Sequence, residues 1–261
     1  MPLVMGILNV TPDSFSDGGQ FNSLEAAVER AEQMIAAGVD IIDIGGESTR
    51  PGAKPLPLQQ ELDRVIPVVY ALRDCGKPLS IDTYKPEVMR EALAAGADMI
   101  NDINGLFEPG AVEIVAGSQC GLCVMHMQHN PETMQISPYY QDTVCEITAF
   151  LQERVTELEK AGIARKRMCI DPGFGFGKTL EHNLTILRNI ESIQNALGLP
   201  LLAGLSRKTM IGTITGKSTN ARLAGSLAAA LVAVANGARI LRVHDVAETV
   251  DALKVWHIAM K

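Results

Sequence analysis

Short apolar runs recur along this chain at intervals of roughly thirty residues, and each ends in a polar residue. The eight runs, each given with the polar residue that follows it, are Leu3–Leu8 with Asn9, Val39–Ile44 with Glu47, Leu79–Ile81 with Asp82, Met99–Ile100 with Asn101, Leu122–Met125 with His126, Met168–Ile170 with Asp171, Leu201–Leu205 with Ser206, and Ile240–Leu241 with Arg242. Between them Ala, Leu and Glu recur at helical spacing. Because parallel strands buried on both faces read as continuous apolar runs, eight strand–helix units in 261 residues predict an α/β fold, a single (β/α)8 TIM barrel.

The expected helices have ordinary sequence signals at their ends. Pro86 and Gly96 are predicted to bound the third helix, and Gly198 to end the sixth. Two connections, Val10–Asn22 after the first strand and Ser48–Leu58 after the second, are longer than the others. The loops at the carboxyl ends of barrel strands surround the active site, and long loops in a compact domain are usually functional. We therefore expect both connections to be lids.

The composition supports one domain over residues 1–261 and limits the partners. An apolar content of 47% is enough to build the core of a chain of this length. A net charge of −7 argues against nucleic acid and anionic membranes as partners. The Ala-rich stretch Leu227–Ala235 is too short to span a bilayer, and Met1–Leu8 lacks a basic leader. Five cysteines, an odd number, argue against a disulfide framework and favour the cytoplasm.

Motifs that point to other cofactors are incomplete. Gly177-Lys178-Thr179 looks like the end of a phosphate-binding P-loop, but Pro172 stands where that pattern requires glycine. Cys120 and Cys123 form a single pair, and Cys123 falls inside an apolar strand, as a core thiol would. These segments therefore predict neither a nucleotide site nor a zinc site.

Three strands end in a carboxylate or an amide. These residues are Asp82, Asn101 and Asp171. One interpretation is a structural network that closes the top of the barrel. Three such residues around one mouth, without a basic residue in their own strands, instead favour a ligand. Carboxylate and amide groups in a dry pocket suit a flat heterocycle with several N–H donors and acceptors, and a carboxylate also stabilises positive charge that develops nearby.

Basic residues follow the last two strands, where barrels of this type usually bind phosphate. Lys208 follows the seventh strand, and Arg242 and His244 follow the eighth. Lys208 is either a Schiff-base amine, as in barrel aldolases, or, as its place beside Arg207 favours, an electrostatic and hydrogen-bonding group. Arg207 is either a phosphate ligand or a surface salt-bridge residue. Asn9 ends the first strand and is a candidate oxygen ligand for Mg²⁺, which commonly bridges phosphates.

Taken together, these segments resemble the signatures of the dihydropteroate synthase family. The resemblance covers essentially the whole chain in family order, through the segments Leu8–Gly19, Ile44–Gly52, Ser80–Thr83, Ile100–Asp102, Asp171–Lys178, Ser206–Lys208 and Arg242–His244. Members of this family are transferases of folate biosynthesis and targets of sulfonamides. The resemblance implies that 6-hydroxymethyl-7,8-dihydropterin diphosphate and p-aminobenzoate give 7,8-dihydropteroate and pyrophosphate in an SN1-like, Mg²⁺-assisted reaction.

The resemblance also implies a role for each matching residue. The residues implied to be catalytic are Asp82, Lys208 and Asn9, and the metal ligand is Asn9. Those implied to bind the pterin are Asp82, Asn101, Met125, Asp171, Phe176 and Lys208. The diphosphate is assigned to Asn9, Thr49, Arg242 and His244, and p-aminobenzoate to Phe15, Arg50, Pro51 and Thr209.

Three further expectations come with the family. Thr209 replaces a serine that many relatives carry, but it keeps the hydroxyl. No insertion follows Phe15, unlike in drug-resistant relatives, so we expect sensitivity to sulfonamides. Members of the family are generally dimers that associate through their C-terminal helices, and a homodimer is expected here.

Two alternatives remain to be weighed. A methyltetrahydrofolate-binding methyltransferase barrel also uses Asp and Asn for a pterin, but it has no diphosphate site. Arg50, Lys208, Arg242 and His244 argue against it. The second alternative is an inactive pterin-binding paralogue that acts as a partner or regulator. Such proteins tend to lose catalytic positions, whereas every expected position is filled here.

Overall fold

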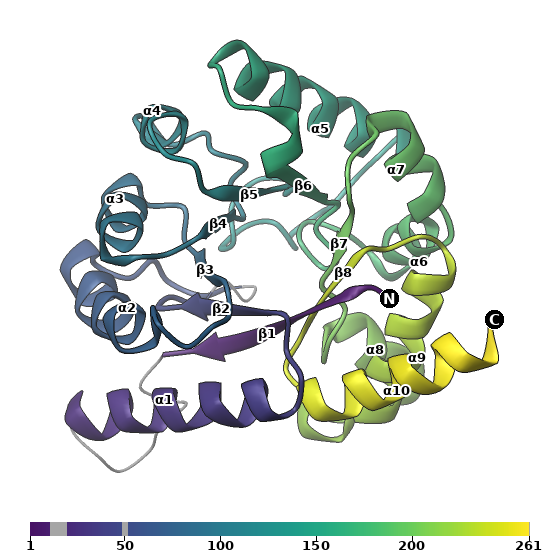
Figure 1. Ribbon diagram of the computed structural model, residues 1–261. Coiled ribbons are helices and arrows are strands. Elements are labelled where there is room, and N and C mark those ends of the chain that lie inside the picture. The colour runs from purple at the N-terminus through teal and green to yellow at the C-terminus, as the bar shows by residue number, and fades with distance from the viewer. Residues whose placement is uncertain (11–19, 49–51, 261) are drawn as a thin grey trace.

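The computed structural model describes residues 1–10, 20–48 and 52–260, and its strands form a closed parallel barrel (Figure 1). The strands are β1 (Leu3–Asn9), β2 (Ile41–Gly45), β3 (Leu79–Asp82), β4 (Met99–Asp102), β5 (Gly121–Met125), β6 (Met168–Asp171), β7 (Leu202–Ala203) and β8 (Ile240–Val243). Hydrogen-bonded neighbours follow the order β6-β5-β4-β3-β2-β1-β8-β7. An isolated parallel bridge between Ile170 and Leu201 joins β6 to β7 and closes the ring. The predicted TIM barrel is confirmed.

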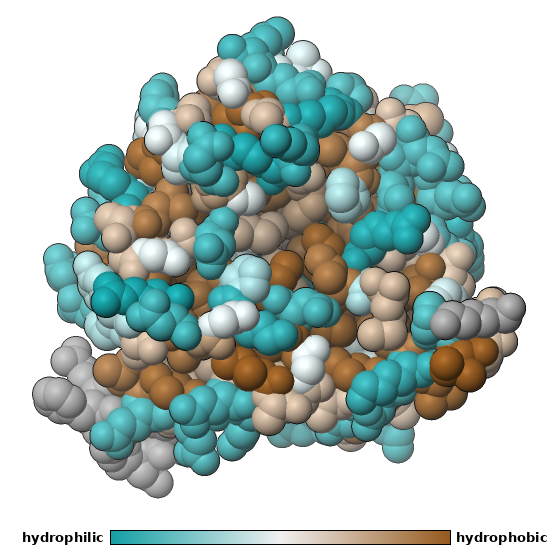
Figure 2. Space-filling view, in the orientation of Figure 1, coloured by the Kyte–Doolittle hydropathy of each residue, from teal (hydrophilic) through white to brown (hydrophobic). Residues whose placement is uncertain are grey.

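Helices surround the barrel, as Figure 1 shows. They are α1 (Gln20–Ala36), α2 (Leu58–Leu72), α3 (Pro86–Ala95), α4 (Ala111–Ala116), α5 (Thr143–Lys160), α6 (Leu180–Arg188), α7 (Ile190–Leu197), α8 (Thr209–Thr215), α9 (Leu223–Ala235) and α10 (Val246–Ala259), with short 3-10 turns at Arg165–Arg167 and Thr219–Ala221. Hydrophilic side chains cover much of this outer layer (Figure 2). None of the described helices is both long and apolar enough to cross a membrane.

The helix ends agree with the sequence signals in one place and differ in another. Pro86 opens α3, and Gly96 ends it in the left-handed conformation at φ 115°, as predicted. The stretch that ends at Gly198 holds two helices, α6 and α7, rather than one. Asn189 interrupts it, because its side-chain amide bonds to the carbonyl of Thr185 and its own φ is −116°. An asparagine that bonds to nearby backbone competes with helix continuation.

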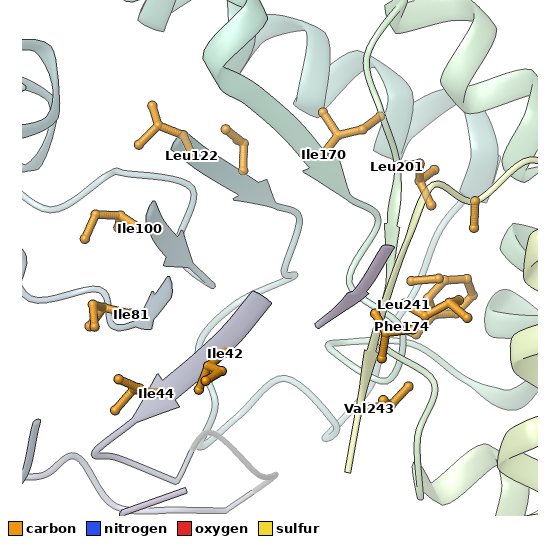
Figure 3. Close-up of a cluster of buried hydrophobic side chains, with 14 of the residues drawn as sticks. Ile42, Ile44, Ile81, Ile100, Leu122, Ile170, Phe174, Leu201, Leu241 and Val243 are labelled. Atoms are coloured by element: carbon orange, nitrogen blue, oxygen red, sulfur yellow. The ribbon is translucent and has the colours of Figure 1, made fainter. Parts of the chain in front are cut away.

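Side chains on each strand alternate between the helix layer and the barrel interior. The outward residues are mainly Ile, Leu and Val, and Figure 3 shows Ile81, Ile100, Leu122 and Ile170 pointing away from the barrel centre. They are fully or almost fully buried within the main core cluster. This double burial explains why the strands read as continuous apolar runs in the sequence.

The inward residues near the amino ends of the strands form a separate apolar layer, which we call the floor. Its members are Met5, Ile41, Met99, Cys123, Cys169, Leu202 and Ile240. Cys123 therefore lies in the barrel interior, as predicted for a core thiol. The floor fills the amino end of the barrel, and the polar residues that end the strands lie at the opposite, carboxyl end.

The two long connections lie partly outside the described residues. Phe15 falls within 11–19, and Thr49, Arg50 and Pro51 make up 49–51. Their assignment to lids and to ligand contacts therefore stays a prediction.

We expect Ile100→Ala to lower the free energy of unfolding by about 2–5 kcal/mol, because a fully buried side chain between strand and helix layer would leave a cavity. Urea denaturation followed by circular dichroism measures the change. Ile136→Ala is the matched control, since that side chain is 75% exposed and its loss should cost less than about 0.5 kcal/mol. Equal losses for both variants would contradict the packing described here.

Candidate active site

A polar layer lies directly above the floor. At the inward positions next along the strands stand Asp43, Asp82, Asn101, Asp171 and Arg242. Asp82 is in register with Gly45 of β2 and Asn101 of β4. The structure thus brings together the three acidic or amide residues of the sequence prediction, places the predicted Arg242 beside Asp82, and adds one buried carboxylate, Asp43.

Arg242 crosses the barrel interior and connects two carboxylates. Its Nε donates to Asp43 Oδ2 at 2.6 Å, and its Nη2 donates to Asp82 Oδ2. Burial by itself would lower the pKa of Arg242, but the charges of Asp43 and Asp82 raise that pKa above its ordinary value. Arg242 is therefore a permanent cation held among anions.

Asp43 is the one member of this layer that sequence reasoning missed. It is fully buried, and its Oδ2 also accepts a hydrogen bond from Asn101 Nδ2 at 3.2 Å. Asp43 therefore orients both Arg242 and Asn101. A signal was present: an acid in the middle of the apolar run Ile41–Ile44, on the face opposite Ile42 and Ile44, is costly unless it is paired.

Asp82 keeps one oxygen available. Its Oδ2 bonds to Arg242, while its buried Oδ1 has no hydrogen-bond partner within the described part of the chain. Burial raises the pKa of Asp82 to about 7; Arg242 opposes the rise, and Asp43 adds to it. A carboxylate with an unmatched oxygen in a buried layer is suited to receive an N–H group or to face a cation.

Asp171 is held by the loop that follows β6. Its Oδ1 accepts a hydrogen bond from the Gly173 amide at 2.7 Å. Gly173 has φ 71°, and a Cβ at this position would lie 1.9 Å from the His126 carbonyl oxygen, so only glycine fits. Lys178 then packs beneath this loop, with Nζ 3.0 Å from His126 Nδ1. Lys178, which completes the P-loop-like segment in the sequence, thus binds the loops that follow β5 and β6, next to Asp171.

An apolar wall faces the carboxylates. Phe176 packs in a cluster with Ile103, Met125 and Met134. The ammonium of Lys208 lies 4.1 Å from the centre of the Phe176 ring, a cation–π contact. Burial lowers the pKa of Lys208 to about 8, and Asp171 opposes the shift. Met125, Phe176 and Lys208, all predicted site residues, therefore lie together, with Met125 and Phe176 in one cluster and Lys208 against the Phe176 ring.

Two further predicted residues, His244 and Asn9, lie at the carboxyl ends of β8 and β1. Ser206 Oγ accepts from the His244 amide at 3.2 Å and lies 3.1 Å from its Nδ1, which joins the loops after β7 and β8. Asn9 ends β1 beside Gly45. A Cβ on Gly45 would lie 3.6 Å from Asn9 Oδ1 and 3.7 Å from Asp82 Oδ2, so the glycine keeps the space between these two oxygens clear of a side chain.

Thr209 is the first residue of α8, and Lys208 is its N-cap. The predicted position of Thr209 at a helix N-terminus is therefore correct. Phe15, Thr49, Arg50 and Pro51 lie outside the described residues.

Comparisons with known proteins agree with this geometry. A family described as pterin binding enzyme matches residues 5–244. The chain is 52% identical over 255 residues to the dihydropteroate synthase of Escherichia coli K12, which covers 97% of this chain and 90% of that relative. The crystal structure of Yersinia pestis dihydropteroate synthase with a sulfonamide drug complex has a TM-score of 0.94 at 49% identity, covering 99% of this chain and 94% of that one.

A second solved structure, Burkholderia cenocepacia dihydropteroate synthase complexed with 7,8-dihydropteroate, has a TM-score of 0.92 at 52% identity. It covers 100% of this chain and 92% of the other. Each of these relatives is a dihydropteroate synthase, which favours that family over a methyltransferase barrel. A family match along most of the sequence, and relatives about half identical over nearly its whole length, show that this chain belongs to the dihydropteroate synthase family of transferases.

Proposed function

We propose that this chain condenses 6-hydroxymethyl-7,8-dihydropterin diphosphate with p-aminobenzoate to give 7,8-dihydropteroate and pyrophosphate, using the polar layer above the floor. The observation that carries the proposal is the buried set Asp82, Asn101 and Asp171 facing Lys208 and Phe176. It offers acceptors for the N–H edge of a flat heterocycle on one side and an apolar face for its ring on the other.

The pterin is proposed to lie between these two sides. Asp171 and Asn101 accept from its N–H groups, and Asp82 Oδ1, which is otherwise unmatched, faces the ring. Lys208 donates to the ring carbonyl and N5. Met125 and Phe176 pack against the ring face, a contact that their common cluster supports.

The diphosphate is proposed to extend toward the basic rim. A guanidinium has five N–H donors, and Arg242 uses two of them on Asp43 and Asp82 within the described residues. The others are suited to phosphate oxygens, with His244 and, from the loop after β2, Thr49. A cation fixed in place by buried carboxylates loses little side-chain freedom when it binds an anion.

Mg²⁺ is proposed as the cofactor, with Asn9 as its protein ligand. Among the described residues no group of three Asp, Glu, His or Cys side chains lies close enough to hold a metal. Mg²⁺ usually takes one or two protein oxygens together with phosphate oxygens and waters, so a single amide oxygen beside the open space at Gly45 fits this ion. When bound, Mg²⁺ would neutralise charge on the diphosphate.

The p-aminobenzoate site is proposed to combine the loops and α8. Phe15, Arg50 and Pro51 would form its walls, and Thr209 would receive the carboxylate where free N–H groups favour an anion. Sulfonamides are proposed to compete for this same site, in keeping with the sulfonamide complex of the Yersinia relative.

The charge layout supports an SN1-like order of events. Arg242 and His244 stabilise the departing pyrophosphate, and Asp82 stabilises the cation left on the exocyclic carbon of the pterin. The aniline nitrogen of p-aminobenzoate then attacks this carbon with its lone pair and loses one proton, so that the products are the secondary amine and pyrophosphate. Interactions of this kind act strongly because the polar layer is buried, and charges interact more strongly where water is excluded. The long loops after β1 and β2 are proposed to keep water from the cation.

The chain is also proposed to be a single cytoplasmic domain that forms a homodimer through its C-terminal helices. Val232 on α9, and Val255 and Ile258 on α10, are 45%, 71% and 71% exposed. Figure 2 shows hydrophobic side chains at the C-terminal end of α10. A second copy packed there would remove this apolar surface from water.

Pyrophosphate release from the pterin diphosphate tests the proposed function. We expect release that requires both p-aminobenzoate and Mg²⁺, and loss of at least tenfold in rate when the metal is chelated, because the leaving group then keeps its charge. A coupled phosphate assay measures it. Binding of the pterin diphosphate without any release would contradict the proposal and support an inactive paralogue.

Asp82→Asn should lower kcat by roughly 10²–10³-fold but change the dissociation constant of the pterin diphosphate less than about fivefold. The amide keeps an acceptor for the ring but lacks the charge that faces the cation. Steady-state kinetics and isothermal titration calorimetry measure the two effects. Asp63→Asn, on the exposed surface of α2, is the matched control. Equal losses in rate and affinity would remove Asp82 from this role.

The pH dependence of kcat/KM should be bell-shaped, with a narrow maximum between pH 7 and 8. Burial raises the pKa of Asp82 to about 7, so its anion is lost as the pH falls below this value. Burial lowers the pKa of Lys208 to about 8, so its cation is lost as the pH rises above it. Asp82→Asn should abolish the acid limb. A flat profile over roughly pH 6–9 would contradict both roles.

A further inference from the structure

Arg207, between Ser206 and Lys208, has an unusual backbone conformation. Its φ is 57°, which places it in the left-handed region. This region is unfavourable for a residue with a side chain because Cβ approaches the following carbonyl oxygen. A conformation of this kind persists only where surrounding contacts hold it.

Three groups hold Arg207 in place. Its N–H donates to Ser226 Oγ at 2.9 Å, and its carbonyl accepts from Arg222 Nη1 at 2.9 Å. Its guanidinium binds both oxygens of Asp245, through Nε at 3.0 Å and through Nη2. The backbone and the side chain of one residue are thus fixed by α9 and by the start of α10.

The side chain of Asp245 bonds to Arg207 and does not cap its own helix. It occupies the N-cap position of α10, but its side chain makes no cap hydrogen bond. A carboxylate at an N-cap ordinarily accepts hydrogen bonds from free helix N–H groups, and Asp245 lacks this stabilising contact. The Arg207–Asp245 pair stands beside the Ser206–His244 contact, and the two pairs join the loops after β7 and β8.

Successive side chains on either side of this turn have different environments. The guanidinium of Arg207 lies at the rim, 34% exposed, with its planar fork occupied by Asp245. The ammonium of Lys208 lies inside against the Phe176 ring. Arg222 also donates to the Lys208 carbonyl, and its guanidinium fills the space beside Gly212, where a Cβ would lie 2.2 Å from Nη2. The segment around Lys208 is therefore held from outside the barrel.

We propose that Arg207 is a positioning residue: its pair with Asp245 holds the left-handed turn that directs the Lys208 ammonium into the pterin site. The inference rests on the proposed function of Lys208. It favours a positioning role over direct phosphate binding, because Nε and Nη2 of Arg207 are bound to Asp245.

Two substitutions of Arg207 separate the effect of its left-handed backbone from the effect of its ion pair. Arg207→Ala keeps the Cβ penalty and loses the pair with Asp245, whereas Arg207→Gly loses the pair but adopts the left-handed region freely. We expect Arg207→Ala to lower kcat/KM for the pterin diphosphate by at least about tenfold, and Arg207→Gly to recover most of this loss. Arg188→Ala, which breaks an exposed pair with Glu181 on α6, is the control and should change kcat/KM less than about twofold.

The pH profile tests whether Lys208 itself has moved. Burial lowers its pKa, opposed by Asp171 and Asp82 and assisted by Arg242. In Arg207→Ala the ammonium should become more solvated, and the basic limb of kcat/KM should shift to higher pH by about one unit or more. Arg207→Gly should keep the parental limb. If either substitution at 207 prevents folding, Asp245→Asn, which retains the shape of the partner, should show the same shift.

Two outcomes would overturn the inference. Equal large losses for Ala and Gly with a raised KM for the pterin diphosphate would make Arg207 a phosphate ligand. Unchanged kinetics in both Arg207→Ala and Arg207→Gly would show that Arg207 forms a surface ion pair without a positioning role. If the parent binds the pterin diphosphate but releases no pyrophosphate, the proposed function fails instead. The dissociation constants of the same variants for that compound then decide the inference, with weaker binding by Ala than by Gly expected.

Discussion

The ion pairs of Arg242 inside the barrel are the interaction on which the site depends. Removing a charged group from water costs several kcal/mol per ion, and only well-placed partners repay that cost. Here one guanidinium connects Asp43 to Asp82, and Asp43 in turn holds Asn101. Loss of Arg242 would leave the carboxylates of Asp43 and Asp82 buried without a charged partner. The polar layer is therefore one unit, whose geometry is set before any ligand arrives.

The layers beneath and around this unit give it its properties. The apolar floor closes the amino end of the barrel, and the Ile and Leu side chains of the outer strand faces pack against the helices. Charges above the floor thus have water on one side only. This environment brings the pKa values of Asp82 and Lys208 to about 7 and about 8. An acid and a base with pKa values close to each other thus belong to the same buried site.

Much of this arrangement was predictable because it follows from periodicity. Strands buried on two faces are apolar throughout, so the polar residue at each end marks the carboxyl mouth, and Asp82, Asn101 and Asp171 were found in this way. Asp43 was missed because it sits within a run instead of ending it. The role of Arg207 was also undetermined, since its partner Asp245 lies 38 positions away and its φ depends on contacts from two other helices. Local sequence carries no record of such tertiary partners.

The seam between β6 and β7 gives the barrel an uneven resistance to opening. Strand β7 has only two residues, and a single bridge between Ile170 and Leu201 joins it to β6, whereas β1 and β2 are paired over five positions. The ring is thus thinnest between the strand that ends in Asp171 and the strand that leads to Lys208. A ligand bound by both of these residues would link the two strands across that seam. A bound ligand would therefore raise the free energy of local opening at this seam, where the barrel has the fewest backbone hydrogen bonds between neighbouring strands.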